Sequence, residues 1–131
     1  MESNQKNQLI TSWLTLTNIQ MKITNELENK LQQNHQLSLN EFYVLLFLSK
    51  APEKKLKLQQ LHSMVGLSQS AMSRLVSRFE AKGCGTLRRH ICVDDRRAIF
   101  TSLTTEGEEL LKEAFGTFNE PLQILFLKKQ F

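Results

Sequence analysis

The feature that most constrains this chain is Gly66, a glycine that stands between two short amphipathic segments. Residues 59–65 have the apolar spacing of a short helix, which Gly66 interrupts. Ser68 follows where an N-cap belongs, so a second helix is predicted over about 68–82, ending before Gly83. Two helices joined by a tight glycine turn are typical of a helix-turn-helix.

Beyond Gly83 the sequence changes from helical to strand-like patterning. Residues 86–92 and 98–103 are predicted as two strands, with Asp94 and Asp95 at the turn between them. A hairpin directly after the second helix makes this segment a winged helix-turn-helix. The predicted fold class is therefore mainly α, with a two-stranded β wing.

Long apolar helices flank this segment on both sides. Residues 9–34 place leucine and other apolar side chains three and four apart, without a proline or glycine between them. Residues 104–131 form a second apolar helix, capped by Thr104 or Thr105, and Pro121 is predicted to end or kink it. One small lobe cannot bury both apolar faces, so we predict that these helices form the interface of a homodimer.

The length of 131 residues indicates one domain. A winged helix-turn-helix lobe is predicted over residues 38–103, between the two dimerisation helices. Ser38 and Glu41 have capping-box spacing and predict the first helix of this lobe, which Pro52 follows. We therefore expect a single domain over residues 1–131.

Basic side chains are concentrated in the middle third of the chain. Residues 54–97 carry ten basic and three acidic side chains, whereas the formal net charge of the whole chain is +4. A contiguous basic segment between near-neutral flanks favours a polyanion as partner over a merely solvated surface. Double-stranded DNA is the polyanion that a helix-turn-helix predicts.

The second helix of the motif has a polar face of short serines and long arginines, with no acidic residue before Glu80. Serine hydroxyls let a helix approach phosphates closely, and arginine suits guanine; an ordinary solvent face would mix glutamate with lysine. The amides at its N-terminus also suit a phosphate. We predict DNA contacts from Ser68, Gln69, Ser70, Ser73, Arg74, Ser77 and Arg78 of this helix, and from Arg88, Arg96 and Arg97 of the hairpin.

The tip of the hairpin carries two arginines next to two aspartates. Arg96 and Arg97 can reach into a narrow minor groove, where negative potential is concentrated. The aspartates can pair with them and hold the tip in shape. The alternative is an ordinary charged turn.

Three stretches resemble the MarR family of multiple antibiotic resistance regulators. They are Leu58-Gln-Gln-Leu61, Gly66-Leu-Ser-Gln-Ser-Ala-Met-Ser-Arg-Leu-Val76, and Asp95-Arg-Arg-Ala-Ile-Phe-Thr-Ser-Leu-Thr104 through Gly107. The resemblance implies a homodimeric winged-helix transcription factor with its recognition helix in the major groove. It also implies that Arg97 enters the minor groove and that Asp95 stabilises the wing beside it.

These expectations define a sequence-specific regulator, predicted to be a repressor. A two-fold dimer places its recognition helices about one DNA turn apart, roughly 34–36 Å, and therefore predicts an inverted-repeat operator. The alternative is a winged-helix adaptor that binds a protein and does not read DNA.

The resemblance also implies a crevice for a small aromatic effector between the dimer helices and the DNA-binding lobe. Trp13, Phe42 and Tyr43 are the residues predicted to line it, although Trp13 also suits a core or an interface. Cys84 and Cys92 are a second hypothesis, because a thiol beside an arginine can sense oxidants. The alternative for them is two ordinary small residues.

The sequence lacks the residues that other classes of function need. The histidines lie in separate segments without metal-ligand spacing, and no nucleophile and base recur in a catalytic pattern. We therefore predict no enzyme activity, no metal and no cofactor. A polar N-terminus, two cysteines and no apolar run of about 20 residues predict a cytoplasmic protein without a membrane span.

Overall fold

The computed structural model describes residues 2–81, 85–91 and 99–128. Helices dominate, and the short strands come between and after the central helices. The elements are, in chain order, α1 (Glu2–His35), α2 (Leu39–Lys50), the 3-10 turn η1 (Pro52–Lys54), β1 (Lys55–Lys57), α3 (Leu58–Val65), α4 (Gln69–Ala81), β2 (Leu87–Ile91), β3 (Ile99–Leu103) and α5 (Thr105–Leu127).

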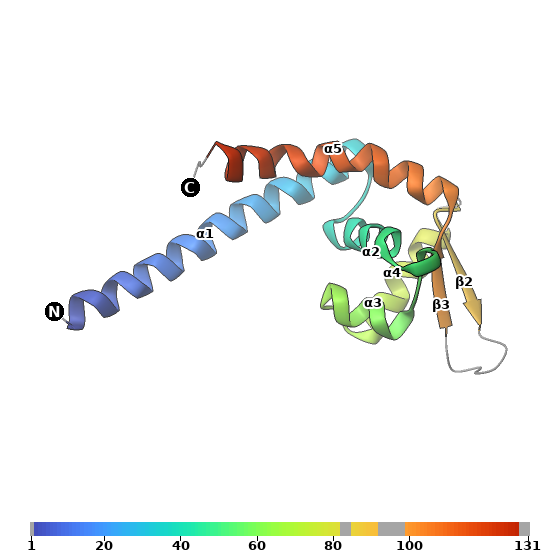
Figure 1. Ribbon diagram of the computed structural model, residues 1–131, viewed down its shortest axis with the longest axis horizontal. Helices are drawn as coiled ribbons and strands as arrows, with labels where there is room; N and C mark the ends of the chain where they lie inside the picture. The colour runs from blue at the N-terminus through green and yellow to red at the C-terminus, as the bar shows by residue number, and fades with distance from the viewer. Residues whose placement is uncertain (1, 82–84, 92–98, 129–131) are drawn as a thin grey trace.

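The two long helices lie together on one side of a lobe made by α2, α3, α4 and the sheet (Figure 1). The C-terminal part of α1 packs along α5, and its N-terminal part extends past the end of α5, away from the lobe. Thirty-four residues of helix span about 51 Å at 1.5 Å per residue. The predicted order of helix-turn-helix and hairpin is confirmed.

The sheet has one strand more than the sequence predicted. β3 lies between β1 and β2, antiparallel to both, so that Leu56 and Arg89 each face Thr101 in the register. The prediction of a two-stranded wing was incomplete because β1 is only three residues long and shows no usable alternation. Its pairing partner, β3, lies some forty residues away in the chain.

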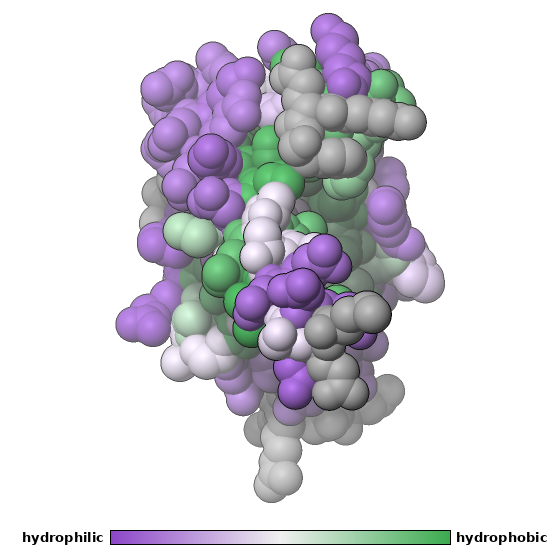
Figure 2. All heavy atoms as spheres, turned by 90° about the vertical axis from the view of Figure 1, so that its left-hand side faces the viewer, coloured by the Kyte–Doolittle hydropathy of each residue, from purple (hydrophilic) through white to green (hydrophobic). Residues whose placement is uncertain are grey.

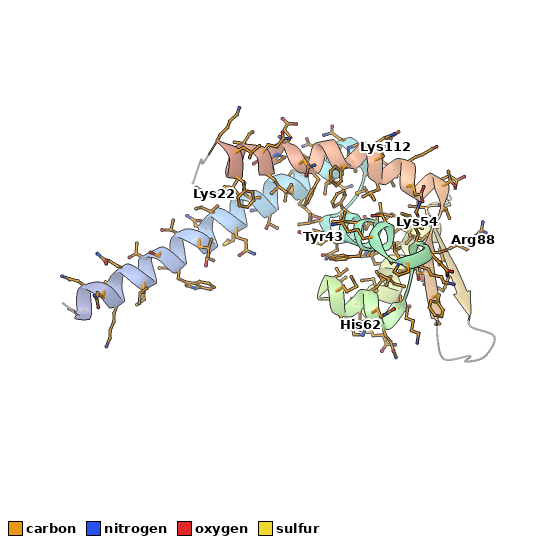
Figure 3. The ribbon with its side chains drawn as sticks, in the orientation of Figure 1. Lys22, Tyr43, Lys54, His62, Arg88 and Lys112 are labelled. Atoms are coloured by element: carbon orange, nitrogen blue, oxygen red, sulfur yellow. The ribbon has the colours of Figure 1, made fainter. Side chains whose placement is uncertain are left out.

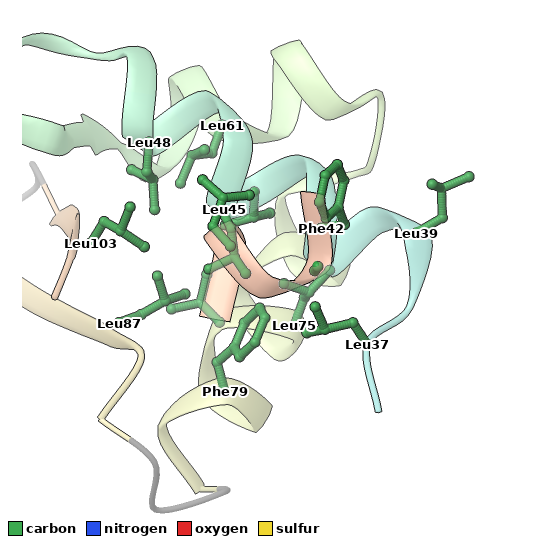
Figure 4. Packing of buried hydrophobic residues seen from close by; sticks show 14 of the residues in the cluster. Leu37, Leu39, Phe42, Leu45, Leu48, Leu61, Leu75, Phe79, Leu87 and Leu103 are labelled. Carbon is green, nitrogen blue, oxygen red and sulfur yellow. The ribbon is translucent and has the colours of Figure 1, made fainter. Parts of the chain in front are cut away.

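The core of the lobe lies between its three helices and the sheet. α4 contributes one side of this core and α2 the other, and leucines from the strands close the end (Figure 4). Its fully buried large side chains include Phe42, Leu45, Leu48, Leu61, Met72, Leu75, Val76 and Phe79. Val44 of α2 is fully buried as well.

Local hydrogen bonds set where the helices begin. The predicted capping box of α2 is confirmed, with the Glu41 amide donating to Ser38 Oγ over 3.1 Å and the Ser38 amide to Glu41 Oε1 over 2.8 Å. Thr104, rather than Thr105, caps α5, because its Oγ1 accepts from the Gly107 amide at 3.1 Å. Gly66 ends α3 at φ 86°, a left-handed conformation that favours glycine.

Both long helices differ from their predicted limits. α1 begins at Glu2 rather than near residue 9, since the polar residues before Leu9 contain nothing that breaks a helix. α5 continues through Pro121 to Leu127, so of the two predicted effects of this proline, the end of the helix was wrong. The ring costs one backbone hydrogen bond, but Pro121 is buried and α5 remains packed against α1.

None of the helices within the described ranges carries an apolar run long enough to cross a bilayer.

Replacing Gly107 by alanine tests the close approach of α5 to the sheet. The added methyl would collide with the backbone oxygen of Thr86 and with the Leu103 side chain. We expect Gly107→Ala to lower the free energy of unfolding by about 1–3 kcal/mol, measured by chemical denaturation. Gly116→Ala is the control on the same helix: its methyl meets no atom within 4 Å, and alanine should stabilise the helix by up to about 1 kcal/mol. Equal stability changes in both variants would contradict the crowding at Gly107.

Candidate nucleic-acid interface

The turn before α4 holds the start of this helix in place. The Leu67 amide donates to the His62 carbonyl at 3.1 Å, which closes the turn after α3. Ser68 then caps α4, because its Oγ accepts from the Ala71 amide at 3.1 Å. These bonds satisfy backbone groups that would otherwise lack partners at a helix end. Ser68 and Gln69 themselves are exposed.

Burial of one side of α4 decides which side faces solvent. Met72, Leu75, Val76 and Phe79 are at most 2% exposed and anchor the helix to the core. Five of the side chains predicted to contact DNA therefore lie together on the opposite side, which we call the α4 face: Ser70, Ser73, Arg74, Ser77 and Arg78. With Ala71 they line a shallow hollow of about 690 Å³.

The α4 face is positively charged. In the part of the chain that the structure describes, no carboxylate forms an ion pair with Arg74 or Arg78. The first turn of α4 has no acidic residue, so nothing there opposes an anion at the positive end of the helix dipole. Two exposed guanidinium groups among small hydroxyls suit phosphate oxygens and base edges.

Strand β2 sends its two arginines in different directions. Arg89 reaches α4, where its Nη2 donates to Ser77 Oγ at 3.1 Å and to the Ser73 carbonyl at 3.4 Å. Arg88, the preceding residue of the strand, is exposed and points away from the body of the lobe (Figure 3). Alternation along a strand accounts for this difference. The sequence had placed Arg88 among the DNA contacts and had assigned no role to Arg89.

Two lysines of β1 add charge that the sequence analysis did not single out. Lys55 Nζ lies 5.5 Å and Lys57 Nζ 5.9 Å from the centre of the Phe100 ring. These are cation–π distances, and the register places Lys57 opposite Phe100. The alternating Lys-Leu-Lys was the only available signal, and three residues are too few to show a strand.

Several predicted site residues lie outside the described residues. They are Asp95, Arg96 and Arg97 of the wing tip, and Cys84 and Cys92. Within the described ranges, no group of three or more His, Cys, Asp or Glu side chains is placed to hold a metal ion.

A second hollow, which we call the α1/α5 groove, runs between the long helices. It has a volume of about 750 Å³, and its lining includes Leu16, Ile19 and Ile23 of α1, Tyr43, and Phe118 and Phe126 of α5. Of the three predicted effector residues, only Tyr43 contributes to its wall. Phe42 is fully buried beneath, stacked on Phe118 at 4.4 Å between ring centres, and Trp13 is 65% exposed on the free part of α1.

A helix-turn-helix with a cationic outer face, followed by a small sheet, defines this chain as a winged-helix protein. Residues 35–98 match the sequence model of the MarR family. This segment of the chain is therefore similar to the MarR family, which confirms the resemblance seen in its motifs.

Solved structures of transcriptional regulators, two of them described as MarR family proteins, are similar over nearly the whole chain. Sco3205, a MarR family transcriptional regulator from Streptomyces coelicolor solved in complex with DNA, has 24% identity and a TM-score of 0.84, covering 93% of this chain and 74% of its own. AbsC, a MarR family regulator from the same organism, has 25% identity and a TM-score of 0.83, with 92% and 80% covered. The transcriptional regulator BldR from Sulfolobus solfataricus has 29% identity and a TM-score of 0.72, with 98% and 84% covered.

The ionisation of Tyr43 tests the environment at the inner end of the α1/α5 groove. Burial, and secondarily the Glu28 carboxylate, raise the pKa of Tyr43 above its ordinary value of 10.0. Because Tyr43 is the sole tyrosine of the sequence, tyrosinate absorbance reports this group alone. We expect a titration midpoint above 10.0 in the folded protein and close to 10.0 in denaturant.

The same shift predicts a pH dependence of stability. The folded state holds the Tyr43 proton more tightly, so this contribution is complete below pH 10.0 and is lost as pH rises through the raised pKa. Glu28→Gln should lower the pKa only part of the way, since burial is the larger cause. A native midpoint at or below 10.0 would show that Tyr43 is not buried as described.

Proposed function

We propose that this chain is a transcriptional regulator that binds double-stranded DNA, with α4 as its recognition helix in the major groove. The observation that carries the proposal is the α4 face, on which Arg74 and Arg78 have no acidic partner among the described residues. The MarR family protein Sco3205 has been solved in complex with DNA, which supports the same use of the fold.

The contacts divide into those that set affinity and those that set specificity. Phosphate contacts by Ser68, Gln69 and Ser70 at the start of α4 would position the helix, and Arg74 would read a base edge. Arg97 at the wing tip would enter the minor groove, with Asp95 beside it, while Arg88 and Arg96 add phosphate contacts. Each neutralised phosphate makes binding more sensitive to salt.

We further propose that two copies bind an inverted-repeat operator and repress transcription in the cytoplasm. The free part of α1 exposes large apolar side chains, among them Leu9 at 71% and Trp13 at 65%. Figure 2 shows hydrophobic side chains gathered along the middle of the face from which α1 projects, bordered by hydrophilic ones. Apolar surface of this extent favours burial against a second copy.

A small aromatic molecule is the proposed effector, and the α1/α5 groove supports this proposal. Its walls are mainly apolar, and Tyr43 supplies one hydroxyl at its inner end. A molecule bound there would shift α1 relative to α5. Because the proposed dimer is held by these helices, the shift would change the spacing of the two recognition helices. Oxidation of Cys84 or Cys92 is the other proposed trigger. An effector of either kind must change DNA affinity when it is added.

The alternative function is that of a winged-helix adaptor that binds a protein. Salt dependence distinguishes the two, because an adaptor has no phosphate contacts to lose.

Replacing Arg74 tests the recognition helix. The assay measures binding to the DNA upstream of the protein's own coding sequence, against a scrambled duplex, over a range of salt concentrations. Arg74→Ala should weaken selective binding about tenfold or more, as expected for a base contact worth roughly 1–3 kcal/mol. Lys112→Ala removes the same charge from α5, on the side of the molecule away from α3 and His62 (Figure 3). It should change affinity less than about twofold, because distant charges are screened.

Two outcomes would contradict this proposal. Binding that does not weaken with salt would indicate the adaptor. Equal losses in Arg74→Ala and Lys112→Ala would show that only net charge matters, and that α4 is not the recognition helix.

The dimer is tested by charging the exposed part of α1. Trp13→Glu should convert the wild-type dimer into monomer, measured by light scattering, because a carboxylate cannot be buried in an apolar interface without a partner. Asn18→Glu adds the same charge at an exposed polar position of α1 and should remain dimeric. A monomeric wild type would overturn the dimer, and a dimeric Trp13→Glu would exclude this part of α1 from the interface.

A further inference from the structure

We propose that Arg89 is a positioning residue for DNA binding: it joins the wing to the recognition helix and neutralises Glu80, without itself contacting DNA. The inference rests on the proposed function, since it concerns the same α4 face.

The guanidinium of Arg89 is already occupied within the protein. Besides its bonds to Ser77 Oγ and the Ser73 carbonyl, its Nε lies 3.3 Å from Glu80 Oε1. This Nε is buried and has no hydrogen-bond acceptor, so the Glu80 carboxylate is its compensating charge. The two side chains are 28% and 40% exposed, so the ion pair lies at the edge of the lobe, with only the Nε atom of Arg89 buried beneath it.

The three partners of Arg89 lie in one line along α4. Ser73, Ser77 and Glu80 are four and three residues apart, the spacing of neighbours on a helix surface. Arg74 and Arg78, each one position later in the helix, are exposed. Arg89 therefore lies along the border of the α4 face nearest to β2. It leaves the arginines of α4 free to contact DNA.

Neutralising Glu80 matters because it is the sole acidic residue of α4. An unpaired carboxylate on the recognition helix would repel the phosphates that the α4 face is proposed to bind. The same ion pair holds β2 against α4, and β2 leads directly into the wing tip. A single side chain thus links the orientation of the wing to the charge of the recognition helix.

This role and a direct phosphate contact predict different results for a pair of substitutions. If Arg89 acts through Glu80, Arg89→Ala should weaken selective binding about tenfold, and Glu80→Gln should restore most of that loss in the double variant. The slope of log affinity against log salt should change by less than the roughly 0.9 expected for one lost phosphate contact. If Arg89 contacts DNA, the two substitutions should act additively and the slope should fall by about that amount.

The four proteins of this cycle are also compared by thermal unfolding, which does not depend on DNA. Arg89 and Glu80 should be coupled there as well, so that the double variant loses less stability than the two single losses together. Lys112→Ala serves as the control for the loss of one charge. Should Arg89→Ala fail to fold, Arg89→Gln keeps a donor for Ser77 without a charge for Glu80, and the same rescue by Glu80→Gln is expected.

Additive effects on binding or the absence of coupling in unfolding would overturn the inference. Failure of the wild type to bind any duplex would instead overturn the proposed function and the role of Arg89 in it. If Arg89 and Glu80 were still coupled in unfolding, their ion pair would have a structural role alone.

Discussion

The rest of the structure depends on the burial of one side of α4. Four apolar side chains of this helix, Met72, Leu75, Val76 and Phe79, fill the core between α2 and the sheet. Because they occupy one side of a helix, they fix its rotation, and with it the direction in which Arg74 and Arg78 point. The free energy that holds the proposed recognition surface in place is thus mainly hydrophobic, although the surface itself is polar.

A few polar contacts then join the parts that surround this core. Glu28 of α1 accepts a hydrogen bond from the Leu39 amide at 3.0 Å, at the start of α2. Lys30 lies 3.7 Å from Glu120 of α5, and His35 Nε2 is 2.8 Å from Thr117 Oγ1. The long helices are therefore connected to each other and to the lobe near the end of α1. Of these three contacts, the one from Glu28 joins α1 to α2, and the other two join α1 to α5.

The sequence predicted the elements that short-range signals specify. Gly66 and Ser68 located the turn and the start of α4, and Ser38 with Glu41 located α2, because a left-handed glycine and a capping hydroxyl act over a few residues. Local sequence patterns did not predict the features that depend on contacts between residues far apart in the chain. β1 pairs with a strand far along the chain, and α5 passes through Pro121 because packing against α1 outweighs the lost hydrogen bond. The serine and arginine face of α4 was apparent from helical periodicity.

By itself, the sequence determined the resemblance to the MarR family, the order of the helices and wing, and which side of α4 is polar, since each follows from local motifs and spacing. Only the tertiary structure decided how those polar residues are used. It places Arg89 against Ser77 and Glu80, directs Arg88 to solvent, and buries Phe42 while Tyr43 lines the α1/α5 groove. The physical reason is that a side chain's partners depend on which elements pack together, and residues on different elements meet only when the core brings their backbones close.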